Sequence, residues 1–173
     1  MHIDAKTKVG SLLDAYPDLE DVLIGIAPPF KKLKNPILRR SVAKVASLKH
    51  VAAVGRVPLD ELLNTLRIAV GQEPVSVTEE ADVENYFSEQ PSWFDRARVV
   101  RTIDEQADTP SDAMALPTVA KAAENLGGTE ILELVTSFLP APGIDIMRER
   151  GFLVWSLEED PLVIRTFFMK GSA

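Results

Sequence analysis

Residues 116–155, LPTVAKAAENLGGTEILELVTSFLPAPGIDIMRERGFLVW, decide the fold of the second half of the chain. The spacing of the apolar residues changes repeatedly along this stretch, between a helical period and the two-residue period of a strand. Gly127-Gly128 is a typical helix end, and Gly151 marks a second one. The stretch, with two residues before it, therefore predicts a helix (114–126), a strand (129–137), a helix (142–150) and a strand (152–157).

One further strand is expected on each side of this stretch. Residues 98–103, RVVRTI, are rich in β-branched residues, and residues 162–169 follow an acidic turn. The complete order is then β-α-β-α-β-β. This order predicts two helices packed on one face of a four-stranded sheet, a two-layer sandwich over residues 97–173.

The first 71 residues predict a compact bundle of short helices, because prolines, glycines and capping residues interrupt the apolar repeats. We expect Thr7, Asn35 and Ser47 to cap helices, and Gly55 and Gly71 to end them. The five expected helices cover residues 7–15, 17–26, 36–46, 48–54 and 58–70.

An acidic linker is expected between the two halves, over residues 72–96. Its aromatic residues are unusual for a solvated segment and are expected to pack onto a domain, since exposed aromatic clusters are uncommon. These residues are Tyr86, Phe87, Trp93 and Phe94. The fold class expected for the whole chain is α+β, with a helical domain at 1–71 and the sandwich at 97–173.

Composition excludes several kinds of chemistry. The chain has no cysteine, which removes disulfides, thiolate nucleophiles and cysteine-ligated metals. His2 and His50 are the two histidines, and their spacing does not indicate a metal site. No Gly-x-Ser-x-Gly element is present. We therefore expect a protein that is not an enzyme and that carries neither a cofactor nor a metal.

The location of the protein is expected to be the cytoplasm. No run of about 18 apolar residues is present, so no membrane span is expected. The first ten residues, MHIDAKTKVG, lack the apolar core of a signal peptide.

Charge is segregated along the chain although the net charge is −7. Between Val22 and Leu59 there are eight lysines and arginines and no acid, whereas residues 73–112 hold eleven acids and three arginines. The surface from Pro28 to Arg40 is therefore the candidate site for an anionic ligand or a protein partner. Its candidate residues are Phe30, Lys31, Lys32, Lys34, Arg39 and Arg40.

Ordinary structural roles remain open for this basic stretch. It is equally explained as a solvated helix face or as a surface that the acidic linker neutralises, in which case the linker acts as a clasp. Phe30 could anchor a partner or pack inside the bundle.

Two other features are weaker candidates. Residues 47–66 have the rhythm of a helix-turn-helix, but Asp60 and Glu61 at the start of its second helix would repel phosphates, so nucleic-acid binding is not favoured. The start of the helix at Met114–Pro117 suits an anion, although the preceding acids, Asp108 and Asp112, favour simple capping.

The C-terminal half resembles the TusA/SirA-like sulfur-carrier family, and more closely its uncharacterised sister branch, over about residues 98–170. The residues that carry the resemblance are the 116–155 stretch quoted above and the closing strand VIRTFFMK. In the carriers a Cys-Pro-x-Pro motif opens the first helix, and its cysteine carries sulfur as a persulfide. Here Met114 stands at the cysteine position and Pro117 at the second proline. A thioether cannot form a persulfide, so the resemblance implies the fold without the carrier chemistry.

The N-terminal half resembles a small helical domain of unknown function over residues 9–63, VGSLLDAYPDLEDVLIGIAPPFKKLKNPILRRSVAKVASLKHVAAVGRVPLDELL. Some relatives of that domain carry paired cysteines after the second helix and are linked with redox proteins. The corresponding residues here are Ile26–Phe30, which include no cysteine. The same pairing of domains is seen in bacterial proteins that have no assigned activity.

Together these features predict a non-enzymatic binding or regulatory protein whose cysteine-free, sulfur-carrier-like domain serves as a recognition module. One alternative is an accessory protein of sulfur or redox metabolism that acts with a cysteine- or metal-bearing partner. A second alternative is a nucleic-acid-binding regulator.

Overall fold

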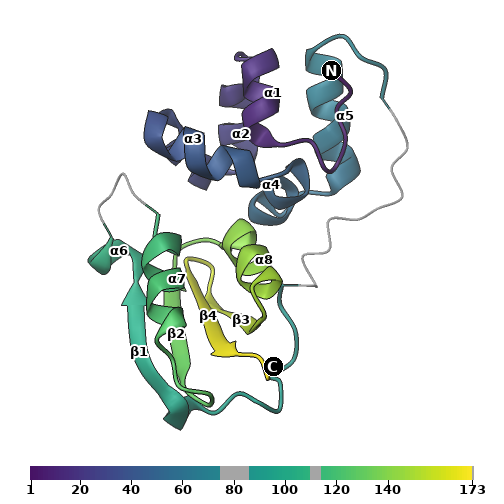
Figure 1. Ribbon diagram of the computed structural model, residues 1–173. Helices are drawn as coiled ribbons and strands as arrows, with labels where there is room; N and C mark the ends of the chain where they lie inside the picture. Colours follow the sequence, from purple (N-terminus) through teal and green to yellow (C-terminus); the bar gives the residue numbers. More distant parts are fainter. Residues whose placement is uncertain (75–85, 110–113, 173) are drawn as a thin grey trace. The chain divides into compact units, whose positions relative to one another are not determined.

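The structure is a computed structural model that describes residues 1–74, 86–109 and 114–172 (Figure 1). The chain divides into two compact units, Met1–Val83 and Glu84–Ala173. The expected α+β class is confirmed: the first unit is helical, and the second combines a mixed sheet with helices. In the described part of the chain, no helix has the length and apolar character needed to cross a membrane.

The N-terminal unit contains a helix in each of the five predicted places, and a 3-10 helix follows the second of them. Their bounds are α1 Val9–Ala15, α2 Leu19–Ile26, η1 Pro28–Lys34, α3 Pro36–Val45, α4 Leu48–Gly55 and α5 Leu59–Ala69. Apolar residues from all six elements form one buried cluster, which includes Leu12, Leu23, Leu48 and Leu66. Burial of this cluster is the main force that holds such short helices, since they are marginal in isolation.

Two of the three predicted helix caps are confirmed. The Asn35 side chain accepts a hydrogen bond from the Ile37 backbone N–H at 2.9 Å, and Ser47 forms a capping box with His50. The prediction for Thr7 is wrong, because α1 begins after Lys8 and has no side-chain cap. Thr7 Oγ1 instead accepts from the Asp4 backbone N–H at 2.9 Å, and so it closes a turn before the helix.

The predicted role of Gly55 also needs correction, whereas that of Gly71 is confirmed. Gly71 has a φ of 75° just after α5, as a helix-ending glycine requires. Gly55 lies inside α4, and the left-handed residue that ends this helix is Arg56, with a φ of 53°. A Cβ atom at Gly55 would lie 2.7 Å from the Ile26 carbonyl oxygen. The glycine therefore allows α4 to approach the end of α2.

The C-terminal unit shows the predicted β-α-β-α-β-β order, with a 3-10 helix before the first strand and a short α-helix after it. Its elements are η3 Arg96–Arg98, β1 Val99–Asp104, α6 Glu105–Asp108, α7 Leu116–Glu124, β2 Ile131–Thr136, α8 Ala141–Glu149, β3 Phe152–Asp160 and β4 Val163–Lys170. The strand order in the sheet is β1-β2-β4-β3 (Figure 1). β1 and β2 are parallel, and the other two pairs are antiparallel.

Helices cover one face of this sheet, as the two-layer prediction requires. Val119 and Ala123 of α7 and Met147 of α8 are fully buried, and they form one cluster with apolar residues of the sheet. The sheet residues of this cluster are Ile103, Leu132, Leu134 and Phe168.

The opposite face of the sheet is also covered, here by residues 86–98, which we call the strap. Phe94 packs against Trp155 and Phe167 with ring centroids 4.7 and 4.5 Å apart. The Trp155 indole N–H donates to the Ser88 carbonyl oxygen at 2.9 Å. At the start of the strap, Tyr86 is buried and donates its hydroxyl at 3.0 Å to Asp145 of α8, on the side of the sheet that the helices cover. The expectation that the aromatic residues pack onto a domain is thus confirmed for Tyr86 and Phe94.

The strap also covers the second face of β2, so this strand is buried on both faces. Residues 86–96 of the expected linker belong to the C-terminal unit. The acids Glu79, Glu80, Asp82 and Glu84, and with them the proposed clasp, lie outside the described residues.

Candidate functional site

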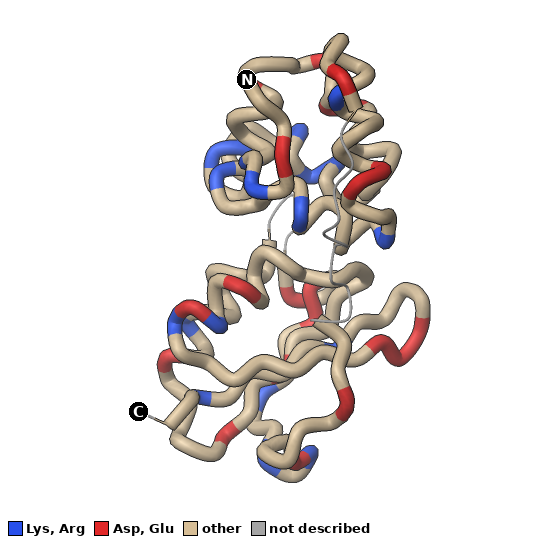
Figure 2. The backbone as a smooth tube through the Cα atoms, turned by 90° about the vertical axis from the view of Figure 1, so that its right-hand side faces the viewer, with Lys and Arg blue, Asp and Glu red and all other residues tan. Residues whose placement is uncertain are grey.

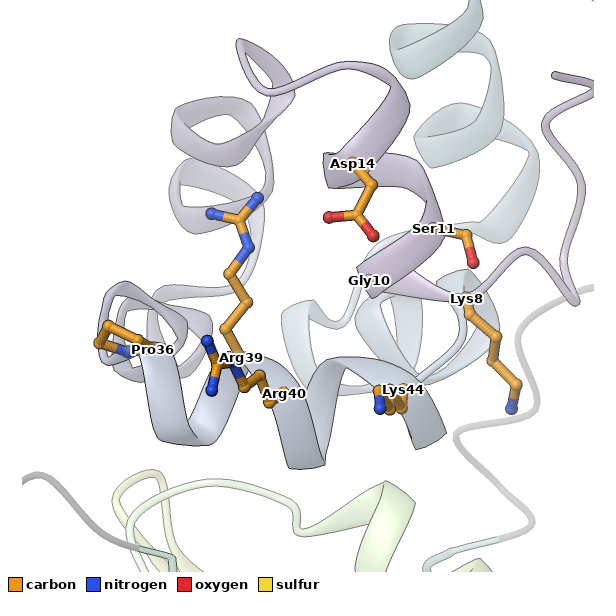
Figure 3. Close-up of a pocket in the computed structure, with 8 residues that line it drawn as sticks. All are labelled: Lys8, Gly10, Ser11, Asp14, Pro36, Arg39, Arg40 and Lys44. Atoms are coloured by element: carbon orange, nitrogen blue, oxygen red, sulfur yellow. The ribbon is translucent and has the colours of Figure 1, made fainter.

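A pocket of about 410 Å³ lies on the N-terminal unit between α1 and α3. Its residues come from these two helices and from Lys8, which directly precedes α1 (Figure 3). The lining residues are Lys8, Gly10, Ser11, Asp14, Pro36, Arg39, Arg40 and Lys44. Four of these eight residues are cationic.

Helical spacing places these side chains on the facing sides of α1 and α3. Lys8, Ser11 and Asp14 follow one another at three-residue intervals, and Arg40 and Lys44 are four residues apart. Gly10 allows the two helices to approach closely, because a Cβ atom there would lie 3.1 Å from the Ala43 carbonyl oxygen. The pocket therefore depends on a small residue at the helix crossing as well as on the charged residues around it.

The four cationic side chains differ in whether they already have a hydrogen-bond or ion-pair partner in the protein. Arg39 donates to Glu20 Oε2 at 2.9 Å, and Lys8 Nζ donates to the Val45 carbonyl oxygen at 2.8 Å. Within the described residues, the side chains of Arg40 and Lys44 have neither an ion-pair nor a hydrogen-bond partner. Both are exposed, so their charge is available to a ligand.

Among the described residues that line the pocket, Asp14 is the single carboxylate. Figure 3 shows its carboxylate on α1, across the pocket from Arg39 and Arg40 on α3. The lining thus carries four positive charges against one negative charge. Figure 2 marks the Lys and Arg positions along the backbone of this unit.

The structure separates the six residues predicted for this surface. Arg39 and Arg40 line the pocket, whereas Lys31, Lys32 and Lys34 lie on η1 and are not part of its lining. Lys34 Nζ lies 3.5 Å from the Asp21 carboxylate. Phe30 is 7% exposed and belongs to the core of the unit, so its structural role is the one inside the bundle.

Sequence reasoning missed Lys8, Ser11, Asp14 and Lys44 as members of one site. Ser11 and Asp14 lie three residues apart on α1, Lys8 directly precedes this helix, and Lys44 lies one turn after Arg40. The spacing within each helix was therefore visible in the sequence. The pairing of α1 with α3 was not, since it depends on packing between residues about 30 positions apart.

Met114 and Pro117, interpreted from the sequence as a degenerate sulfur-carrier motif, lie at the start of α7. Pro117 is the second residue of this helix and is exposed, and Met114 precedes the helix and is half-buried. Asp112, one of the two acids expected to cap the helix, lies outside the described residues. Asp108 accepts a hydrogen bond from the Asp104 backbone N–H at 2.7 Å and therefore contributes to the turn at α6.

A second charged cluster lies on the strap side of the sheet, around Glu133 of β2. The Glu133 side chain is 1% exposed, and three side chains donate hydrogen bonds to its carboxylate. Arg96 of the strap and Arg165 of β4 bind Oε1 at 2.7 and 2.9 Å, and Thr102 of β1 binds Oε2 at 2.7 Å. Sequence reasoning missed this cluster because a glutamate in an alternating strand suggests a solvent-facing position.

Hydrogen bonds control the protonation of Glu133. Burial by itself raises the pKa of this carboxyl, but the hydrogen bonds from Thr102, Arg96 and Arg165 and the charge of Arg96 outweigh burial, so the pKa is below its ordinary value. Because the carboxylate is fully engaged by protein donors, we assign the cluster to holding the strap on the sheet.

Comparison with known families gives a match in the N-terminal unit. Residues 3–63 match the family described as Domain of unknown function (DUF1858). These residues form a DUF1858 domain. The expected resemblance to a helical domain of unknown function is thereby confirmed, and the α1–α3 pocket lies within the DUF1858 domain. No curated protein and no solved structure matches the chain.

The described residues contain no group of three or more His, Asp or Glu side chains that is placed to hold a metal ion. The sequence-based expectation of no metal and no cofactor stays a prediction.

Proposed function

We propose that this protein is a non-enzymatic binding or regulatory protein that recognises a negatively charged group through the α1–α3 pocket of its DUF1858 domain. The observation that carries the proposal is the pair Arg40 and Lys44, two exposed cations without a partner among the described residues, at a pocket of about 410 Å³. A concave surface with an excess of one charge concentrates counter-charged ligands and accelerates their association.

The C-terminal unit supports a recognition role within this proposal. Its β-α-β-α-β-β order and the proline in the first turn of α7 are what a TusA/SirA-like domain would have. Met114 stands where the carriers have their reactive cysteine, and a thioether cannot be deprotonated to a nucleophile. A domain of this fold without the cysteine would therefore serve to recognise a partner and not to transfer sulfur.

Binding of three fluorescent anions by the full chain tests the proposal: AMP, poly-L-glutamate and single-stranded DNA, each at low and at high salt. We expect at least one of them to bind at low salt, with an affinity that falls by about tenfold or more in the Arg40→Glu/Lys44→Glu variant. Added salt should also weaken binding, because the interaction is electrostatic.

The matched control for this experiment is Lys121→Glu/Arg150→Glu, which reverses two exposed charges in the other unit and gives the same net charge. This control should bind like the wild type. If no anion distinguishes the pocket variant from the control, the proposal is wrong.

Single-stranded DNA is included because the same experiment tests the alternative function, a nucleic-acid-binding regulator. The structure gives no support to a recognition helix at α5, because Asp60 and Glu61 lie in its first turn and Arg67 in its last turn is buried. We therefore expect poly-L-glutamate to bind more strongly than single-stranded DNA.

A further inference from the structure

The exposed face of α3 carries apolar residues beside the two free cations. Ile37 is 75% exposed and Val45 is 37% exposed, although both are large and apolar. Arg40, Ser41 and Lys44 lie between them in the sequence and are exposed as well. Arg40, Ser41, Lys44 and Val45 follow Ile37 by three, four, seven and eight residues, and these spacings place all five on the same side of the helix.

We infer that the anionic group is part of an acidic, amphipathic segment of a protein partner, which binds along this face of α3. The inference rests on the proposed function and names the kind of partner for the same site. We call the five residues Ile37, Arg40, Ser41, Lys44 and Val45 the α3 face.

The dimensions of the α3 face specify what the partner must present. Ile37 and Val45 are eight residues apart, which corresponds to about 12 Å along the helix axis. A partner helix would match this spacing with two apolar residues separated by about two turns, and with acidic residues between them that reach Arg40 and Lys44. The opposite charges would set the register of the segment, and the apolar contacts would add affinity.

The apolar residues distinguish this partner from a small anion. A phosphorylated metabolite in the pocket needs the cations but gains nothing from Ile37, which does not line the pocket. A membrane surface also attracts cations, but helices that lie on membranes need a continuous apolar face, and here the two apolar residues are separated by charged and polar ones.

Selection from a random peptide library displayed on phage tests the inference. Peptides of about 16 residues, long enough for a helix of about 24 Å, are selected on the full chain and counter-selected on the Arg40→Glu/Lys44→Glu variant. We expect the enriched peptides to contain apolar residues about two helical turns apart with Asp or Glu between them.

The best peptide is then synthesised and its affinity measured for single variants. Ile37→Ser should weaken binding by about fivefold, since a side chain of this size contributes of the order of 1 kcal/mol at a contact that remains partly exposed. Lys44→Glu should weaken it by about tenfold. The matched control Ile68→Ser removes another exposed isoleucine, 63% exposed on α5, and should leave the affinity unchanged.

The outcomes separate this inference from the proposed function. If Lys44→Glu weakens binding and Ile37→Ser does not, the pocket recognises charge alone, and the inference is wrong while the proposed function stands. The inference is also wrong if no peptide is enriched, or if the enriched peptides contain no Asp or Glu. Binding to phosphatidylserine vesicles is measured in parallel. If no peptide binds, while the wild type and Ile37→Ser bind the vesicles equally well, the partner is a membrane surface and the inference is wrong. If neither variant affects any anion or peptide, both proposals fail.

Discussion

Glu133 shows how a single residue joins three strands and a loop. Its carboxylate accepts hydrogen bonds from Thr102 of β1, Arg165 of β4 and Arg96 of the strap, and Glu133 itself lies on β2. A buried carboxylate is costly unless donors replace the water that it loses. Here three side chains donate hydrogen bonds to the Glu133 carboxylate, so the residue stabilises one arrangement of the strap on the sheet.

Glu133→Gln should lower the stability of the C-terminal unit at neutral pH, by about 1–3 kcal/mol, because hydrogen bonds to the charged carboxylate are replaced by weaker ones. The difference between the wild type and this variant should shrink in acid. The pKa of Glu133 is lower in the folded state than in the unfolded chain. As the pH falls below the ordinary glutamate pKa of about 4.3, the unfolded chain therefore takes up the proton first. The stability that the charged Glu133 contributes to the wild type is lost as the pH falls further, through the folded-state pKa.

Urea unfolding at a series of pH values, followed by tryptophan fluorescence, measures this effect, since Trp93 and Trp155 both belong to this unit. Glu124→Gln, which changes an exposed glutamate of α7, is the matched control. An unchanged difference between the wild type and Glu133→Gln from neutral to strongly acidic pH would show that the carboxylate charge does not hold the strap.

At the scale of elements, glycines decide where helices of the DUF1858 domain can meet. Gly10 lies where α1 approaches α3, and Gly55 lies where α4 approaches the end of α2. At neither position does a positive φ explain the glycine, since both lie within helices and the described glycines with positive φ are Gly71 and Gly151. The absent Cβ atoms instead allow close backbone contacts.

Gly55→Ala should therefore destabilise the helical unit although alanine is the better helix former. The helix propensity gained is about 1 kcal/mol, but the new Cβ would lie 2.7 Å from the Ile26 carbonyl oxygen, and the displacement of backbone costs about 1–3 kcal/mol. Urea unfolding followed by circular dichroism measures the net effect. Gly25→Ala, where a Cβ meets no atom within 4 Å, is the matched control and should be neutral or stabilising.

At the scale of the whole molecule, each unit has its own buried core. The core of the N-terminal unit is built from buried residues between Ile3 and Leu66. In the described part of the C-terminal unit, buried residues between Ile103 and Met169 pack with one another and with Trp93 and Phe94 of the strap. Both tryptophans lie in the C-terminal unit. Tryptophan fluorescence thus reports on one unit, and circular dichroism reports on both.

Leu66→Ala should destabilise the N-terminal unit alone. Leu66 is 0% exposed, and loss of a buried leucine side chain costs about 2–5 kcal/mol. Followed by circular dichroism, unfolding of the N-terminal unit should move to a lower urea concentration. The transition followed by tryptophan fluorescence, which reports on the C-terminal unit, should stay at the same urea concentration. A parallel shift of both transitions would mean that the two units unfold together.

Local sequence patterns were enough to predict the order of the elements, because these patterns depend on neighbouring residues. The helical spacing in residues 116–126, the cap at Asn35 and the helix end at Gly71 each act within a few positions, and the structure confirms them. The family match confirms the resemblance of the first half to a helical domain of unknown function.

The sequence by itself determined the α+β class, the β-α-β-α-β-β order and the exclusion of cysteine chemistry. Tertiary structure alone decided that Lys8 and Lys44 share a pocket with Arg40, that Phe30 lies in a core, and that Glu133 is buried beneath a strap. The physical reason is that element formation follows the period of nearby side chains. The site and the buried charge depend instead on contacts between residues that are 30 or more positions apart.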